Sequence, residues 1–173
     1  MIKIDHLQGI PFKEGSDDCF GLMRQFYSEN FDVNMLDYAR PEGWWRTAPD
    51  LDLYMKYFRA EGFESIDVHP RETAIGDGFL MMVLSKVVNH AAAYVGDGKI
   101  LHHTYGRLSN VESYGSLWRR VTVVHLRHPK VFALIEAEKP KTLTKVDLMD
   151  LLPPGMRKIL EPGIAEIQSS DRQ

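Results

Sequence analysis

The sequence predicts an α+β fold in which N-terminal helices pack on a central antiparallel sheet. Apolar residues in the first third of the chain recur at helical spacing, which favours helices there. The middle of the chain instead holds short β-capable runs separated by glycine-containing turns, which favours strands. The 173 residues, 44% of them hydrophobic, suffice for one globular domain with its own core.

Two helices are expected before the strands. Capping side chains at 16–18 precede Cys19, and apolar residues follow at helical spacing, which predicts a helix from about Asp18 to Glu29. Apolar residues from Leu51 to Phe58 recur at i, i+3, i+4 and i+7, and Gly62 can end this second helix as a C′ glycine.

The strands are expected in the middle of the chain. Phe79–Leu84 is a continuous apolar run, typical of a buried strand. Asn89–Val95 and Lys99–Thr104 flank the turn sequence Gly96-Asp97-Gly98, and this pattern predicts a β-hairpin. The β-branched run Arg119–Leu126 predicts a further strand.

The C-terminal part of the chain differs from the rest. Residues 131–138 and 144–152 predict short helices ended by prolines, and the polar end at 168–173 is expected to fray. We therefore expect one domain over residues 1–128 and a C-terminal appendage over 129–173 that could serve as a docking segment.

Composition excludes several classes of protein. A net charge of −3 argues against a dedicated nucleic-acid binder, which normally presents a strongly basic face. The longest apolar stretch, Phe79–Leu84, is far too short to span a membrane, and the first residues lack the apolar segment of a signal peptide. We expect a protein made in a cytoplasm, without nucleic-acid or membrane partners and with no export route encoded in its own sequence.

Cys19 is the candidate nucleophile. A lone cysteine is more often an inert core residue, and it cannot form an intramolecular disulfide. Its predicted place at a helix start favours the thiolate, because the helix N-terminus carries partial positive charge. Asp17 and Asp18 oppose this effect, so the thiol requires a general base.

Three of the seven histidines are candidate bases. His90, His102 and His103 lie on the predicted hairpin, where strands hold side chains in fixed directions suited to a base and its orienting partner. They could also be polar residues of a half-exposed sheet. A strand would point His125 and His128 to opposite faces, so no metal site is expected. The histidines expected to be structural or at the surface are His6, His69, His125 and His128.

The hairpin register decides which neighbour shares the face of His90. If the turn is centred on Asp97, His102 lies on that face. If the loop consists of two residues, Asp97 and Gly98, the register shifts by one and His103 takes that place. Sequence geometry leaves both alternatives open.

Four segments together resemble a known family. Asp18-Cys19-Phe20-Gly21-Leu22 resembles the D-C-S-G-[LF] nucleophile motif of the NlpC family of papain-like cell-wall cysteine peptidases. Gly9-Ile10-Pro11-Phe12 resembles its G-x-P-Y segment, and Gly76-Asp77 followed by Phe79-Leu80 resembles its G-D-L-V strand entry. Residues 89–103 are similar to its H-V-G-I-Y-[LI]-G-[DN]-G-x-[FM]-[IL]-H-A block.

The resemblance covers roughly residues 7–128. Within it, 102–120 looks most like the subgroup found in phage tails, the tail-assembly protein K type. The resemblance implies a papain-like fold and a Cys–His–polar triad, with Cys19 as nucleophile, His90 as general base and His102 as orienting residue. This implication selects the register centred on Asp97.

The resemblance also implies a substrate and a setting. The family's chemistry is hydrolysis of amide bonds in peptidoglycan stem peptides, and it uses no cofactor. The subgroup implies a component of the virion, carried at the phage tail tip with tail-tip or hub proteins as partners. The missing export segment agrees with this, because a virion can bring the enzyme to the cell wall.

Two features depart from the family pattern. Phe12 stands where the motif has a tyrosine whose hydroxyl helps at the active site, and the segment from Phe12 to Cys19 is shorter than in most members. Phe12 and the appendage at 129–173 motivate an alternative, a structural tail-tip or assembly protein with little or no turnover. A third reading is an amidase or acyl-transfer enzyme on the same scaffold. Trp44 and Trp45 are expected to serve packing.

Overall fold

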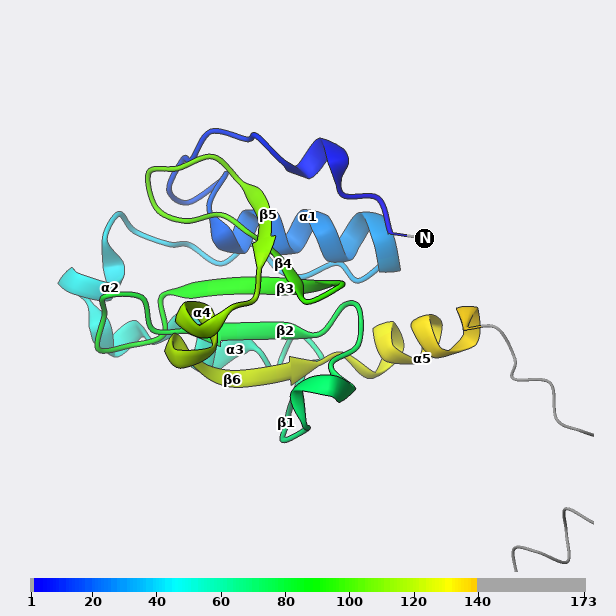
Figure 1. Ribbon diagram of the computed structural model, residues 1–173. Helices are drawn as coiled ribbons and strands as arrows, with labels where there is room; N and C mark the ends of the chain where they lie inside the picture. The colour runs from blue at the N-terminus through cyan, green and yellow to red at the C-terminus, as the bar shows by residue number, and fades with distance from the viewer. Residues whose placement is uncertain (1, 140–173) are drawn as a thin grey trace, which may run out of the picture. The chain divides into compact units, whose positions relative to one another are not determined.

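The computed structural model describes residues 2–139, in which helix α1 lies alongside an antiparallel sheet (Figure 1). The sheet has the strand order β1-β6-β2-β3-β4-β5. Its strands are β1 (Glu64–Ile66), β2 (Gly78–Met81), β3 (His90–Gly96), β4 (Lys99–His102), β5 (Asn110–Ser113) and β6 (Thr122–Arg127). The helices are α1 (Cys19–Phe31), α2 (Trp44–Thr47), α3 (Leu53–Tyr57), α4 (Ser116–Val121) and α5 (Pro129–Glu138). The predicted α+β class is therefore confirmed.

Helix α1 forms where the sequence predicts it. The Asp18 side chain accepts a hydrogen bond from the Gly21 N–H at 2.8 Å and caps the first turn. The helix continues two residues beyond the predicted end, to Phe31, and stops at Asp32 in the left-handed conformation. The buried face of α1 contains Cys19, Leu22, Met23, Phe26, Tyr27 and Phe31.

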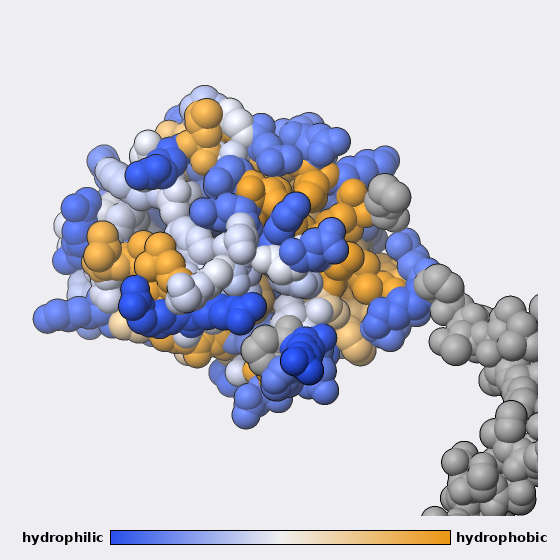
Figure 2. All heavy atoms as spheres, in the orientation of Figure 1, coloured by the Kyte–Doolittle hydropathy of each residue, from blue (hydrophilic) through white to orange (hydrophobic). Residues whose placement is uncertain are grey.

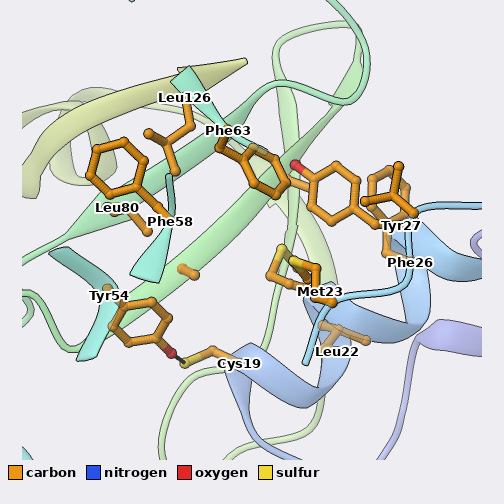
Figure 3. Close-up of a cluster of buried hydrophobic side chains, with 14 of the residues drawn as sticks. Cys19, Leu22, Met23, Phe26, Tyr27, Tyr54, Phe58, Phe63, Leu80 and Leu126 are labelled. Carbon is orange, nitrogen blue, oxygen red and sulfur yellow. Dashed lines mark hydrogen bonds between the residues drawn. The ribbon is translucent and has the colours of Figure 1, made fainter. Parts of the chain in front are cut away.

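The main core lies between α1 and one face of the sheet (Figure 3). Leu80 of β2 and Leu126 of β6 point into it, because successive side chains of a strand alternate between faces. On the opposite face, Phe79 and Met81 form a smaller cluster that Trp118 of α4 partly covers. The sheet is thus buried on both faces at its centre, and the predicted packing of helices on an antiparallel sheet is confirmed.

Strands β3 and β4 form the predicted hairpin. Their register pairs Ala92 with His102. His90 and Ala92 are two residues apart on one strand, so their side chains share a face, and His102 lies on that face too. The register required by a turn centred on Asp97 is confirmed.

The hairpin loop reaches this register in an unexpected way. Gly96 pairs with Lys99, so the loop itself consists of Asp97 and Gly98, whose φ angles of 50° and 67° are both positive, as in a type I′ turn. A bulge between Tyr94 and Gly96 then adds one residue to β3. The two-residue loop and the register centred on Asp97 therefore occur together.

The strand expected at Phe79–Leu84 is shorter in the structure, where β2 ends at Met81. The Asn89 side chain binds both the N–H and the carbonyl of Val83, at 2.8 and 3.0 Å, and folds the following segment into a loop. Leu84 in this loop has a φ of 48° and is fully exposed. The prediction that residues 82–84 continue the strand is wrong.

Two further elements differ from their predicted bounds. The strand predicted from Arg119 begins only at Thr122, because residues 116–121 form α4. The second helix, predicted to reach Gly62, is represented by the short α3 and continues as turns to Gly62 in the left-handed conformation. After α3, a turn hydrogen bond from the Gly62 N–H to the Arg59 carbonyl replaces the helical pattern.

Residues up to Glu138 form one compact unit. Helix α5 belongs to this unit, where its Val131 is buried in the core. The predicted helix at 144–152 and the frayed end at 168–173 lie outside the described residues, and the domain boundary at 128 stays a prediction. In the described part of the chain, every helix is too short or too polar to cross a membrane.

Hydrophobic side chains form separate patches among hydrophilic ones on the face shown in Figure 2. Single exposed apolar residues are normal on protein surfaces. Those of the described part include Leu36, Leu84, Tyr105, Leu108, Leu117 and Val123.

Candidate active site

Cys19 begins α1 with its side chain buried in the core. Its Sγ lies 3.0 Å from the Tyr54 hydroxyl of α3 (Figure 3) and 3.9 Å from the Asn89 carbonyl. Burial raises the pKa of the Cys19 thiol to about 11, with Asp18 adding to the shift and the bond to Tyr54 opposing it. The helix start favours a thiolate, but burial outweighs it. Burial therefore favours the neutral thiol form of Cys19.

The backbone around Cys19 is held by a buried ion pair. Asp18 accepts a hydrogen bond from Arg40 Nε at 2.8 Å, and both side chains are almost fully buried. A Cβ at Gly21 would lie 1.8 Å from the Ser16 carbonyl oxygen, so the close approach of this turn requires glycine. The motif residues around Cys19 thus fix where the sulfur stands.

A chain of side chains crosses three neighbouring strands on the sheet. His90 Nε2 of β3 lies 3.1 Å from His102 Nδ1 of β4, and His102 Nε2 lies 2.5 Å from Glu112 Oε1 of β5. Trp118 of α4 packs edge-on against the His102 ring, with centroids 4.6 Å apart. The two imidazoles are buried, whereas the Glu112 side chain is 42% exposed. The chain runs from the interior to the surface.

Burial keeps both imidazoles neutral. It lowers the pKa of His90 to about 3, and the nearby His102 and His103 add to this shift. Burial also lowers the pKa of His102, against the opposing influence of Glu112. Burial thus disfavours charge on the Cys19 thiol as well as on both imidazoles.

Cys19 and His90 line the same groove, which has a volume of about 420 Å³. Several aromatic side chains line it, and among them Trp45 of α2 contacts Tyr105 edge-on with ring centroids 5.8 Å apart. His90 uses Nε2 for its bond to His102, so Nδ1 is the nitrogen left for a partner in the groove.

The structure brings the three predicted residues into one region without joining all of them. His90 and His102 are hydrogen-bonded, whereas Cys19 bonds to Tyr54. His103 also lines the groove, but its Nε2 donates to the Arg107 carbonyl at 3.0 Å. The catalytic roles of Cys19, His90 and His102 stay predictions.

Three residues of this region were not found by sequence reasoning. Tyr54 lies within the expected second helix, where its apolar spacing indicated only a core residue. Glu112 lies in a segment where no strand was predicted. The structure forms β5 there from the four residues Asn-Val-Glu-Ser, which follow the hairpin closely in the sequence. Nothing in the sequence distinguished Arg40 as the partner of Asp18.

His125 has a structural setting that the sequence did not reveal. Its Nε2 lies 3.0 Å from Asp77 Oδ2, and Arg127 donates two hydrogen bonds to the same buried carboxylate. This cluster links β6 to the turn before β2. Within residues 2–139, no three His, Cys, Asp or Glu side chains gather as metal ligands.

Helices packed on an antiparallel sheet, with a cysteine at the start of α1 facing a groove shared with a strand histidine, define the papain-like class of fold. Residues 9–127 match the NlpC/P60 family, and the chain belongs to this family.

Two curated relatives are tail tip assembly proteins K. That of Escherichia phage lambda is 36% identical over 125 residues, covering 72% of this chain and 60% of the relative. That of Escherichia phage N15 is 31% identical over 121 residues, covering 70% and 49%. The chain thus spans about half to three fifths of the length of these relatives.

Solved structures of the family are also similar. NlpC1 from Trichomonas vaginalis aligns with a TM-score of 0.46 and 21% identity, over 70% of this chain and 39% of its own. An NLP/P60 family protein of Staphylococcus aureus, described as similar to a lipoprotein, aligns with a TM-score of 0.47 and 16% identity, over 71% and 38%.

Proposed function

We propose that the protein is a cysteine peptidase that hydrolyses amide bonds in peptidoglycan stem peptides. Cys19 is the proposed nucleophile, His90 the general base and His102 the residue that orients His90. The observation that supports this most strongly is that Cys19 and His90 line one groove while His90 is hydrogen-bonded to His102. Membership in the NlpC/P60 family supports the same chemistry.

The proposed reaction begins from the neutral pair. His90 Nδ1 takes the Cys19 proton as the sulfur attacks the amide carbonyl carbon, so both charges form together and stabilise each other. The new C–S bond gives a tetrahedral intermediate whose oxyanion can accept a hydrogen bond from the Cys19 backbone N–H. His90 returns the proton to the leaving amine as the C–N bond breaks. Water, activated by His90, then hydrolyses the thioester.

We infer that the enzyme acts as part of a phage tail. The two curated relatives bear the name tail tip assembly protein K, and they match most of the described domain. The proposed setting is the tail tip of the virion, where tail proteins are partners and the cell wall is the substrate. A wall hydrolase at that place would open peptidoglycan locally during infection.

A second candidate function is a structural tail protein on the same scaffold. Its specific support is the resting state of the nucleophile, because Cys19 is hydrogen-bonded to Tyr54 and its pKa is raised to about 11. Phe12 also lacks the hydroxyl expected at its position in the family motif. Docking to other tail proteins requires no turnover.

Mass spectrometry of peptidoglycan fragments separates the two candidates. Purified peptidoglycan is incubated with the wild type, Cys19→Ala and Cys19→Ser, and thermal unfolding confirms that each variant folds. We expect cleaved stem peptides only with the wild type, and the fragment masses identify the bond that is cut. Equal fragments from wild type and variants would exclude the peptidase, and no fragments from any of the three would favour the structural role.

A further inference from the structure

The direction of the proton in the histidine pair decides whether His90 can act as a base. A neutral imidazole carries one proton, so one nitrogen donates and the other accepts. The 3.1 Å bond between His90 Nε2 and His102 Nδ1 is compatible with either direction. Only one direction leaves a lone pair on His90 Nδ1, the nitrogen that must take the proton of Cys19.

The bond at the other end of the chain fixes this direction. A carboxylate only accepts hydrogen bonds, and Glu112 Oε1 lies 2.5 Å from His102 Nε2, so that nitrogen carries the proton. His102 Nδ1 is then the acceptor, and His90 Nε2 must donate to it. His90 Nδ1 is left unprotonated and able to act as a base.

We propose that Glu112 is a positioning residue that sets the tautomers of both histidines, so that His90 keeps its lone pair on Nδ1, the nitrogen not bonded to His102. This inference rests on the proposed function of Cys19 and His90. Glu112 acts through His102, since it does not line the groove that holds Cys19 and His90.

The surroundings of the hydrogen-bonded side chains His90, His102 and Glu112 suit this role. Glu112 pairs with Ile100 in the register of β4 and β5, two residues before His102, so the carboxylate and the imidazole share one face of the sheet. Trp118 packs against both imidazole rings and limits exchange with water. On its outer side, Glu112 borders a separate open hollow, where water can solvate the carboxylate. A charged group at the surface can thus control a buried base.

Nitrogen NMR of the histidine side chains tests the proposal in the wild type. The ¹⁵N shifts of an imidazole distinguish protonation at Nδ1 from protonation at Nε2. At neutral pH we expect protonation at Nε2 in both His90 and His102. A spectrum with His102 protonated at Nδ1 would overturn the proposal, whatever the activity of the protein.

A matched pair of variants tests the role of the charge. Glu112→Gln keeps the size but offers both a donor and an acceptor, so His102 is no longer forced into one tautomer. We expect a tautomer with Nδ1 protonated to appear at His102 and hydrolysis to fall roughly 10- to 100-fold, as for other outer-shell partners of a functional histidine, because Glu112 acts on His90 only through His102. Glu29→Gln is the control, because Glu29 Oε2 lies 2.5 Å from His6 Nε2 at the exposed surface.

The outcomes separate this proposal from the proposed function. Unchanged tautomers and unchanged hydrolysis in Glu112→Gln, or an equal loss of hydrolysis in Glu29→Gln, would overturn the role of Glu112. If the wild type hydrolyses no peptidoglycan, the proposed function fails, while the NMR spectra of wild type and Glu112→Gln still decide the tautomer assignment.

Discussion

The two halves of the candidate active site differ in how the fold holds them. Cys19 stands at the start of a helix in the apolar core, and its polar contacts include the Tyr54 hydroxyl and, more distantly, the Asn89 carbonyl. His90 stands on the sheet at the end of a polar chain that reaches the surface at Glu112. The nucleophile is thus kept neutral by burial, whereas the base is oriented by hydrogen bonds. Chemistry at this site depends on both features together.

Replacing the base tests this division most strongly. His90→Ala should reduce peptidoglycan hydrolysis by about 10³-fold or more, because it removes general base catalysis altogether. His103→Ala removes an imidazole in the same groove that bonds to the Arg107 carbonyl, and it should keep activity within about 10-fold. Initial rates of amino-group release measure both. A larger loss in His103→Ala than in His90→Ala, with both variants folded, would show that His90 is not the general base.

The buried ion pair of Arg40 and Asp18, next to Cys19, can be tested separately. Arg40→Ala leaves Asp18 buried without its charge partner, so it should lower the free energy of unfolding by about 3–5 kcal/mol. Denaturant unfolding measures this loss. Lys130→Ala is the comparison, because its pair with Asp32 is exposed and should contribute less than about 1 kcal/mol. Similar losses in both variants would show that burial of the Asp18 pair has little consequence.

The low pKa of His90 predicts instability in acid. An unfolded histidine takes up a proton near pH 6.5, but folded His90 does so only near pH 3. Between these values the unfolded state binds more protons, so stability falls as pH decreases, by up to about 1.4 kcal/mol per pH unit from this group. His102 and His103 shift in the same direction. His90→Gln should show a shallower decline in unfolding free energy than the wild type, and parallel declines would contradict the buried neutral His90.

The smallest expected effect is that of the Tyr54 hydroxyl. Its bond to Cys19 lowers the thiol pKa against the effect of burial, so Tyr54→Phe should raise that pKa further. The rate at which iodoacetamide alkylates Cys19 at pH 8 should then fall several-fold, because the lost hydrogen bond contributes about 1 kcal/mol to the stability of the thiolate. Faster alkylation in Tyr54→Phe would mean that the hydroxyl mainly shields the sulfur.

The sequence was most informative where local rules dominate. The cap at Asp18 and the turn at Asp97 depend on neighbouring residues, and both the helix and the hairpin formed as predicted. The bulge in β3 could not be predicted, because it depends on how β3 pairs with its neighbours. The strand predicted from Arg119 started three residues too early, because residues 119–121 belong to helix α4. β-branched residues become frequent only from Val121 onward.

The candidate site was predictable only in part, for a related reason. Cys19 and the hairpin histidines belong to recognisable sequence blocks. Tyr54 and Arg40 approach Cys19 and Asp18 from segments 35 and 22 residues away, so only the packed fold brings these pairs together. Glu112 reaches His102 because β5 pairs with β4, and β5 was not predicted from the sequence. Contacts set by tertiary pairing carry no local signal.

A covalent intermediate gives the most direct test of the account. Wild-type protein mixed with soluble stem peptides and quenched in acid is examined by intact-protein mass spectrometry and peptide mapping. The account predicts a mass increase equal to one acyl fragment, located at Cys19 and absent in His90→Ala. Cleavage of the peptides without any acyl group on Cys19, or an acyl group on another side chain, would contradict it.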